Sequence, residues 1–375
     1  MASHHRLWTF RARGPPSSVL AFTSGPAPTL PPRLPLPRDS PTPEEWILVK
    51  VAFAGLNVGA IFQMTLIPAL LRADTCTPEM DLSGTVTDAW HPDADAAGSR
   101  FARGDKVVAM LPASHALATG TGALAEYIAI PAKYAVRKPD NVSFADAAGC
   151  LLTGMTAAQL VADAALKPGQ GVLVVAASGG IGTMVVQMAR KAVGAAGRVV
   201  GVCSGANADT VRGLGADDVV DYTLHADLAA HLGAAFASAP FDAVVDTLGF
   251  QALYARSPSY LVPGGVYCSV GIKPPSFGVP DFLRAVVQMK LNEWWPVARW
   301  LGGVGRPWKG ASMMSPTRED RESIVGMLAR GELRVVRDSV WAFADADKAY
   351  EKLGGRHARG KVLVRVDGGV GDDEC

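Results

Sequence analysis

Metal-ligating and disulfide-forming patterns are missing from this sequence. Its five cysteines are spread over 375 residues with no CxxC pair, and its seven histidines form no HxxxH pair. Scattered cysteines of this kind are usually small buried side chains in a reducing compartment. The sequence therefore argues against a disulfide framework and against a clustered metal site.

Long apolar runs and an excess of one charge are also missing. No segment approaches the run of about 18 apolar residues that a membrane-spanning helix needs, and the N-terminus lacks the apolar centre of a signal peptide. Three arginines between residues 6 and 13 suit an organelle-targeting segment, but this stretch and residues 19–22 suit a first β-hairpin equally well. The 36 basic and 35 acidic side chains leave a net charge of +1, so no basic face for nucleic acid is expected. We expect a cytoplasmic protein that binds neither nucleic acid nor a membrane.

The sequence does have enough apolar material for two cores. Apolar residues make up 49% of the chain and charged residues 19%, and the chain is longer than one ordinary core requires. Up to about residue 150, strand-like segments alternate with turn residues, which predicts a partly open β-barrel or sandwich. The prolines between residues 26 and 43 indicate an extended surface connection. Residues 281–308 are rich in tryptophan; they suit a core or a subunit contact better than a lid over a substrate.

One stretch in the middle of the chain predicts a phosphate-binding turn. The apolar run 172–176 is followed by a glycine cluster and then by apolar residues at helical spacing. A strand, a tight turn and a helix in this order present backbone N–H groups and the positive end of a helix dipole to a phosphate. Alanine replaces the first glycine of GxGxxG, but further strands and helices alternate after it, as in a doubly wound parallel sheet. We therefore expect a dinucleotide to bind at Ala177, Ser178, Gly179, Gly180, Ile181 and Gly182.

The end of the next predicted strand bears on the choice of dinucleotide. NAD enzymes usually have an acid there that binds the ribose diol, whereas this chain has Cys203 and Ser204. A carboxylate about 4 Å from a 2′-phosphate would be repelled by roughly 4 kcal/mol at an effective dielectric constant near 20, so its absence admits NADP(H). Ser204 can donate a hydrogen bond to that phosphate, although no arginine or lysine follows in the turn 205–207. We favour NADPH over NADH.

Taken together, these residues resemble the medium-chain dehydrogenase/reductase superfamily, and in particular its zinc-free branch of quinone oxidoreductases and enone or enoyl reductases. The matching stretches cover nearly the whole chain and include ILVKVAFAGLN at 47–57, PEMDLSGTV at 78–86, GALAEYIAIP at 122–131, DAAGCLLTGMTAAQ at 146–159, LVPGGVYCSVG at 261–271 and RGKVLVRV at 359–366. The resemblance implies an α/β fold with a GroES-like β-barrel substrate domain (1–152), a doubly wound parallel-sheet Rossmann domain (153–304) and a C-terminal return to the substrate domain (305–375). It also implies a homodimer with cofactor and substrate in the cleft between the domains.

The resemblance bears on zinc as well. Zinc-dependent members have a cysteine at the position of Asn57 and a histidine at that of Met80, and neither an amide nor a thioether is a usual catalytic zinc ligand. Cys150 falls close to the third ligand position, but one thiolate would not hold the ion. Without a metal, hydrogen-bond donors must stabilise charge on a substrate oxygen, each worth about 2.7–4 kcal/mol. That favours easily reduced acceptors, such as an activated C=C bond or a quinone.

Further site residues follow from the resemblance. Asn57 would face the cleft and donate to a substrate oxygen, although a turn-capping role is equally open. The tyrosine that the branch often has a few residues later is replaced by residues 61–63, Ile-Phe-Gln, so no proton donor is assigned. Other positions match family residues near the cofactor, and each also suits an ordinary structural role: Thr156, Tyr222, Gly249, Gly271 and Lys361.

The expected function is hydride transfer from NADPH to a small molecule, either a quinone or the C=C bond of an α,β-unsaturated carbonyl, without zinc. The alternative is a dinucleotide-binding regulatory or structural protein without turnover.

Overall fold

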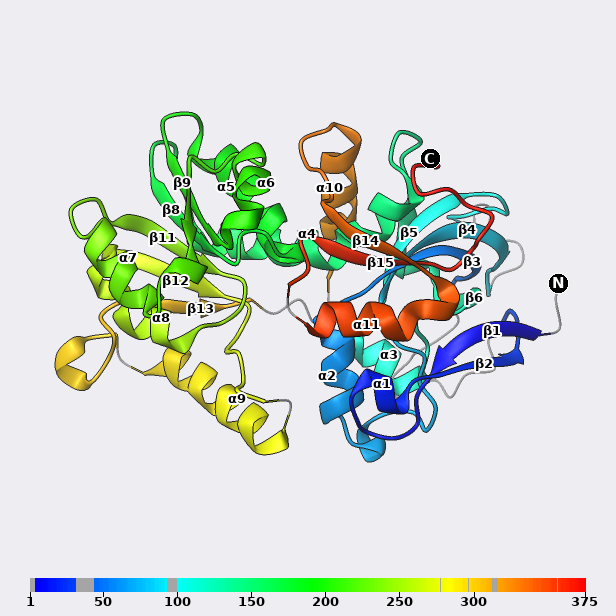
Figure 1. Cartoon of the computed structure of the whole chain (residues 1–375). Coiled ribbons are helices and arrows are strands. Elements are labelled where there is room, and N and C mark those ends of the chain that lie inside the picture. Colours follow the sequence, from blue (N-terminus) through cyan, green and yellow to red (C-terminus); the bar gives the residue numbers. More distant parts are fainter. Residues whose placement is uncertain are drawn as a thin grey trace. The chain divides into compact units, whose positions relative to one another are not determined.

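The computed structural model describes residues 4–31, 44–92, 100–276, 278–295, 297–311, 316–355 and 357–375. Most of the proline-rich connection 26–43 therefore lies outside the described residues. The chain divides into two compact units (Figure 1). The first is Met1–Leu152 together with Met314–Cys375, and the second is Thr153–Met313.

A mostly antiparallel sheet forms the centre of the first unit. Its strands, in sheet order, are β14 (Arg337–Ala342), β15 (Lys361–Arg365), β3 (Trp46–Gly55), β4 (Asp81–Trp90), β5 (Lys106–Met110) and β7 (Ala135–Arg137), with β6 (Tyr127–Pro131) paired to β3. The run of apolar residues in β3 fits a strand covered on both faces, and nearly all of its side chains are buried. The expected first hairpin forms between β1 (His4–Thr9) and β2 (Ala21–Pro26).

The pairing of β15 with β3 joins the end of the chain to its beginning. The two strands are antiparallel, with Leu363 opposite Gly55, and the backbone N–H of Leu56 donates to the carbonyl of Val362 over 2.9 Å. This register carries Lys361 to the residues that follow β3. The helices of this unit are α1 (Pro16–Val19), α2 (Val58–Leu66), α3 (Ala113–Thr119), α10 (Arg318–Ala329) and α11 (Ala346–Gly354).

A parallel sheet forms the centre of the second unit. Its strands, in sheet order, are β10 (Asp218–Asp221), β9 (Arg198–Cys203), β8 (Gly171–Val175), β11 (Phe241–Asp246), β12 (Leu261–Ser269) and β13 (Trp308–Gly310). The order runs outward from β8 in both directions, which is the doubly wound arrangement. Its helices are α5 (Gly180–Val193), α6 (Ala208–Gly213), α7 (Leu228–Phe236), α8 (Gln251–Arg256) and α9 (Val279–Trp294). The predicted fold class, a GroES-like domain with a Rossmann domain, is confirmed.

The C-terminal return begins later than residue 305. Strand β13 pairs with β12, with Trp308 opposite Tyr267, so residues up to Met313 belong to the unit with the parallel sheet. A strand this short carries too little periodicity to be recognised in the sequence. The hydrogen bonds of β13 to β12 place this strand in the second unit, and they are visible only in the folded structure.

The tryptophan-rich segment 281–308 divides between interior and surface. Trp308 is only 6% exposed, as expected of a core residue, but Trp294 is 78% and Trp300 84% exposed. Helix α9 also exposes Leu283 and Val287, one helical turn apart. The interpretation as core is therefore wrong for the exposed face of this helix, whereas Ala285 is buried and Met289 packs against the core of the second unit.

Among the residues that the structure describes, one helix is long and apolar enough to cross a membrane by length and composition alone. It is α4 (Phe144–Ala164), and 72% of its apolar window is buried inside the protein. The residues up to Leu152 belong to the first unit and those from Thr153 to the second. Burial to this extent is what a core helix shows, and the sequence analysis did not anticipate a segment of this hydropathy.

Candidate functional site

The glycine turn after β8 has the geometry of an anion site. A Cβ on Gly182 would lie 2.1 Å from the carbonyl oxygen of Ala176, so only glycine fits there. Ala176 itself has a left-handed backbone, with φ of 56°. Gly179 is the N-cap of α5, and no side chain caps that helix. The first N–H groups of an α-helix have no partner within the helix, so they are available to a phosphate, as the sequence analysis predicts.

An asparagine that the sequence analysis did not single out joins this turn to the end of β9. The Nδ2 of Asn207 donates to the hydroxyl of Ser178 over 3.2 Å and to that of Ser204 over 3.1 Å. Two predicted cofactor residues are thus brought together by a third residue. In the sequence, the turn 205–207 is distinguished only by its lack of a basic side chain. Nothing in the pattern indicates that Asn207 bonds both serines.

An acidic side chain lies beside the same turn, although it comes from a different strand. Asp221 ends β10 opposite Cys203 of β9, and a Cβ on Gly205 would lie 2.4 Å from its Oδ2. Hydrogen bonds from the hydroxyl and backbone N–H of Thr223 and from the N–H of Gly205 lower the pKa of Asp221, so it is ionised at neutral pH. The sequence pattern points to an acid only at the end of the strand that follows the glycine turn, and Asp221 ends the strand after that one. Tyr222, the next residue, is 42% exposed.

The predicted glycines after β11 and β12 touch each other. Gly249 and Gly271 both have positive φ, and a Cβ on Gly249 would lie 2.3 Å from the carbonyl oxygen of Gly271. Asp246 is fully buried at the end of β11 and accepts the backbone N–H groups of residues 248–250 and the hydroxyl of Tyr267. Burial raises the pKa of Asp246, and these bonds oppose the rise. The carboxylate therefore fixes the loop that carries Gly249.

These positions share one edge of the sheet because they follow parallel strands at their carboxyl ends. The exceptions among the predicted cofactor residues are Thr156, which is largely buried on α4, and Lys361, which lies in the other unit on β15.

Lys361 and Asn57 meet in a buried polar cluster of the first unit. The Lys361 ammonium donates to Asn57 Oδ1 over 2.7 Å and to the carbonyl of Leu56 over 3.0 Å. It also lies 3.6 Å from a carboxylate oxygen of Asp81. Lys361 is only 3% and Asp81 only 1% exposed, so this ion pair is almost wholly removed from water.

The Asn57 amide directs its hydrogens into this cluster. Its Nδ2 lies 2.9 Å from the carbonyl of Gly55 and 3.2 Å from carboxylate oxygens of both Glu79 and Asp81. Asn57 is the N-cap of α2, but its side chain does not bond the helix. Three acceptors for two N–H groups leave the amide no spare donor in this arrangement.

Glu79 is a further acid of this cluster to which no role was assigned from the sequence. Its Oε1 accepts the Asn57 backbone N–H over 3.1 Å and the Tyr350 hydroxyl over 2.7 Å. Burial raises the pKa of Glu79 to about 7, against the opposing effect of these hydrogen bonds and of Lys361. Burial likewise raises the pKa of Asp81, and the positive charge of Lys361 opposes this rise. The available signal was the pair of acids at positions 79 and 81, at the start of an apolar strand, because acidic residues are almost never buried without partners.

The residues at the zinc positions do not form a ligand set. Met80 is buried, and the Cys150 thiol lies 3.2 Å from the carbonyl of Ala147, with its pKa raised by burial. A metal needs the thiolate, which burial in apolar surroundings disfavours. Over the described ranges, no group of three His, Cys, Asp or Glu side chains is arranged to hold a metal ion.

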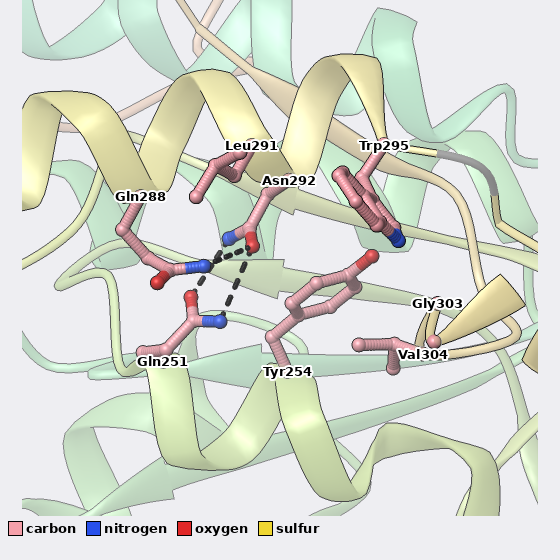
Figure 2. Close-up of a pocket in the computed structure, with 9 residues that line it drawn as sticks. Gln251, Tyr254, Gln288, Leu291, Asn292, Trp295, Gly303 and Val304 are labelled. Carbon is pink, nitrogen blue, oxygen red and sulfur yellow. Dashed lines mark hydrogen bonds between the residues drawn. The ribbon is translucent and has the colours of Figure 1, made fainter.

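A separate pocket of about 290 Å³ lies between α8 and α9 in the second unit (Figure 2). Three amides converge in it: Asn292 Oδ1 accepts from Gln251 over 3.2 Å and from Gln288 over 3.0 Å, and Asn292 Nδ2 donates to Gln251 over 2.7 Å. The indole of Trp295 and the ring of Tyr254 form its apolar end (Figure 2). None of the predicted cofactor residues lines this pocket.

Two family models match the chain. The model described as "Alcohol dehydrogenase GroES-like domain" matches residues 43–140, and the one described as "Zinc-binding dehydrogenase" matches residues 214–364. Among solved structures, a quinone oxidoreductase from Coxiella burnetii has a TM-score of 0.71 at 22% identity and covers 97% of this chain and 100% of its own. A mycobacterial protein complexed with NADPH also has a TM-score of 0.71, at 23% identity, with 96% of this chain and 99% of its own covered. These structures support the fold.

Curated relatives are closer in sequence. Medium chain reductase pydE of an Acremonium species is 36% identical over 98% of this chain and 100% of its own length. Trans-enoyl reductase poxH of Penicillium oxalicum is 30% identical, with 96% and 97% covered. A chloroplast envelope quinone oxidoreductase homolog of Arabidopsis thaliana is 30% identical, with 79% and 82% covered. The chain therefore belongs to the medium-chain dehydrogenase/reductase superfamily, in the branch of quinone oxidoreductases and enoyl reductases, and is an oxidoreductase of that family.

Proposed function

We propose that this protein transfers a hydride from NADPH, without zinc, to the C=C bond of an α,β-unsaturated carbonyl or to a quinone. The observation that carries the proposal is the uncapped start of α5 behind a turn in which only glycine fits at position 182. Such a helix start binds the pyrophosphate of a dinucleotide. The unit with the parallel sheet then binds the cofactor, and the unit with residues 1–152 supplies the substrate side.

The reaction class follows from the chemistry at the zinc positions. NADPH, when bound, would supply a hydride from its nicotinamide ring and would become NADP⁺. In an enone, the hydride adds to the β-carbon, the electron pair of the C=C bond moves toward the carbonyl, and a proton from solvent completes the α-carbon. No Lewis acid is needed for an acceptor whose carbonyl already withdraws electrons, which suits an amide at position 57 and a thioether at position 80.

The choice of NADPH rests on Ser204 and on the absence of an acid at the end of β9. Asp221 opposes it, because its carboxylate lies beside the same turn. We nevertheless favour NADPH, since Asp221 is already engaged by Thr223 and Gly205 rather than free to bind a ribose diol. Equal catalytic efficiency with NADH and NADPH on a good acceptor would overturn this choice.

The alternative is a protein that binds the dinucleotide without turnover. The observation that favours it is the inward direction of both Asn57 amide hydrogens, which leaves that side chain no spare donor for a substrate. NADPH oxidation measured with a simple enone and with a benzoquinone separates the two. Turnover with either supports the reductase, whereas cofactor binding with no turnover over a broad acceptor panel supports the alternative.

We also propose a cytoplasmic homodimer. The exposed apolar side chains of α9, Leu283 and Val287 with Trp294, support a subunit contact. Light scattering on the purified protein should give twice the monomer mass of 39.2 kDa. A monomer at micromolar concentration would contradict it.

A further inference from the structure

Glu79 has a backbone conformation that residues with side chains rarely adopt. Its φ is 74°, in the left-handed region, where the Cβ of an L-residue crowds its own backbone. The other non-glycine residues with positive φ in the described part of the chain are both alanines. A long, acidic side chain at such a position is therefore held there by its own contacts.

Those contacts join two segments of the first unit. The Glu79 carboxylate accepts the backbone N–H of Asn57 and, through Oε2, the Asn57 amide over 3.2 Å. It also accepts the hydroxyl of Tyr350, from α11, over 2.7 Å. The carboxylate thus links the loop before α2 to the helix that precedes β15, while itself being 1% exposed.

Charge fixes which way round the Asn57 amide lies. Its Oδ1 faces the Lys361 ammonium at 2.7 Å, and its Nδ2 faces the carboxylates of Glu79 and Asp81. If the amide were flipped, its oxygen would face two carboxylates and its NH₂ would face an ammonium. Both contacts would be repulsive, so the observed orientation is strongly preferred.

From this arrangement we infer that Glu79 is a positioning residue, which holds the Asn57 amide in one orientation so that Asn57 Oδ1 in turn fixes the Lys361 ammonium. The inference rests on the proposed function, in which Lys361 lies near the cofactor and Asn57 near the substrate. In this role Glu79 touches neither the cofactor nor the substrate, and it acts through Asn57.

The test replaces Glu79 with glutamine, which keeps the size of the side chain and removes its charge. The new NH₂ group of E79Q opposes either the Asn57 NH₂ or the Asn57 backbone N–H. The preference of the Asn57 amide for one orientation is therefore weakened, although Lys361 and Asp81 still favour it. We expect kcat for enone reduction to fall at least about tenfold while the thermal unfolding midpoint at pH 8 does not fall. The side-chain amide resonances of Asn57, measured by ¹⁵N NMR in the protein without substrate, should shift or broaden.

A second variant removes the backbone strain instead. In E79G the left-handed conformation is unstrained, but the carboxylate is absent, so we expect the same loss of kcat as in E79Q. The matched control is S83A, which deletes another fully buried hydrogen bond of this unit, from Ser83 Oγ to the carbonyl of Phe144 over 2.6 Å. That change should lower the thermal midpoint and leave kcat within about twofold.

The outcomes distinguish the inference from the proposed function. Unshifted Asn57 resonances in E79Q, or a wild-type kcat in both Glu79 variants, would overturn the positioning role. If the wild-type protein reduces no acceptor, the proposed function fails. The NMR result then still decides whether Glu79 orients Asn57.

Discussion

At the scale of single residues, the protein concentrates its buried charge in one cluster of the first unit. Glu79, Asp81 and Lys361 are all nearly inaccessible to water. The single ammonium pairs with Asp81 and opposes the rise in the pKa of both acids. Such a cluster is costly to bury and is retained only where each member has partners. Here the partners are Asn57 and Tyr350. The buried ionisable groups of this unit therefore lie at the candidate site residue Asn57.

Removing the single positive charge of this cluster should destabilise the protein strongly. We expect Lys361→Met to lower the free energy of unfolding by about 3–5 kcal/mol, because it leaves Asp81 buried without its countercharge. The control is Lys348→Met, which breaks an exposed ion pair with Asp345 and should cost at most about 1 kcal/mol. Urea denaturation of both variants measures the difference. Equal effects would show that the cluster does not depend on Lys361.

The raised pKa of Glu79 makes stability depend on pH in a definite direction. The folded protein keeps a proton on Glu79 up to about pH 7, whereas the unfolded chain loses it near 4.5. Because the folded state binds more protons in this window, stability falls as the pH rises from about 4.5 to 7. The effect is of the order of 3 kcal/mol. E79Q has no such proton, so the stability of the wild type relative to E79Q should fall between pH 5 and 8. A difference that stays constant or rises with pH would contradict this.

Asp221 should influence the choice of cofactor through its charge. Asp221→Asn removes a negative charge beside the Ser204 turn, and we expect the ratio of NADPH to NADH affinity to rise by about threefold to tenfold, a modest change because exposed charges are screened. Asp209→Asn, at a fully exposed acid on α6, is the control and should leave the ratio unchanged. Titration calorimetry with both cofactors provides the affinities. If the ratio of NADPH to NADH affinity is unchanged in D221N, Asp221 does not belong to the cofactor site.

At the scale of elements, the sequence could predict those helices and strands whose formation depends on residues adjacent in the chain. The β8–turn–α5 unit was predictable, since an apolar run, glycines and helical spacing are adjacent in the chain. Strand β13 and the surface position of α9 were not, because hydrogen bonding to β12 and the lack of a covering element are properties of the fold. The same holds for the site. The glycine turn was predicted from the pattern. In contrast, Asn207 contacts Ser178, Asp221 lies beside Gly205 and Glu79 contacts Tyr350, all of which are distant in sequence.

The turn before α5 offers a test of the predicted phosphate site. A Cβ at position 182 would press against the Ala176 carbonyl, so Gly182→Ala must shift the turn that presents the helix N–H groups. We expect the Kd for NADPH to rise at least about tenfold, the loss of roughly one hydrogen bond to a charged group. Gly354→Ala, in open space at the end of α11, should leave the Kd unchanged. An unchanged Kd for NADPH in G182A would show that the cofactor does not bind at this turn.

At the scale of the whole molecule, we propose a reductase that needs no metal. The described part of the chain has no clustered metal-ligating side chains, and the positions of the family's zinc ligands have an amide and a thioether. Prolonged dialysis against a strong chelator should therefore leave both kcat and the unfolding midpoint unchanged. Stoichiometric zinc in the purified protein by mass spectrometry, with loss of activity on its removal, would contradict this.

The most direct test of the central claim follows the hydride itself. NADPH labelled with deuterium at the transferred position of C4, incubated with the protein and a simple enone, should yield a saturated ketone with one deuterium on the β-carbon. Mass spectrometry of the product shows this as a gain of about one mass unit over the product formed with unlabelled NADPH. Tight binding of NADPH with no labelled ketone from any enone and no hydroquinone from any quinone would contradict the account and would favour a dinucleotide-binding protein without turnover.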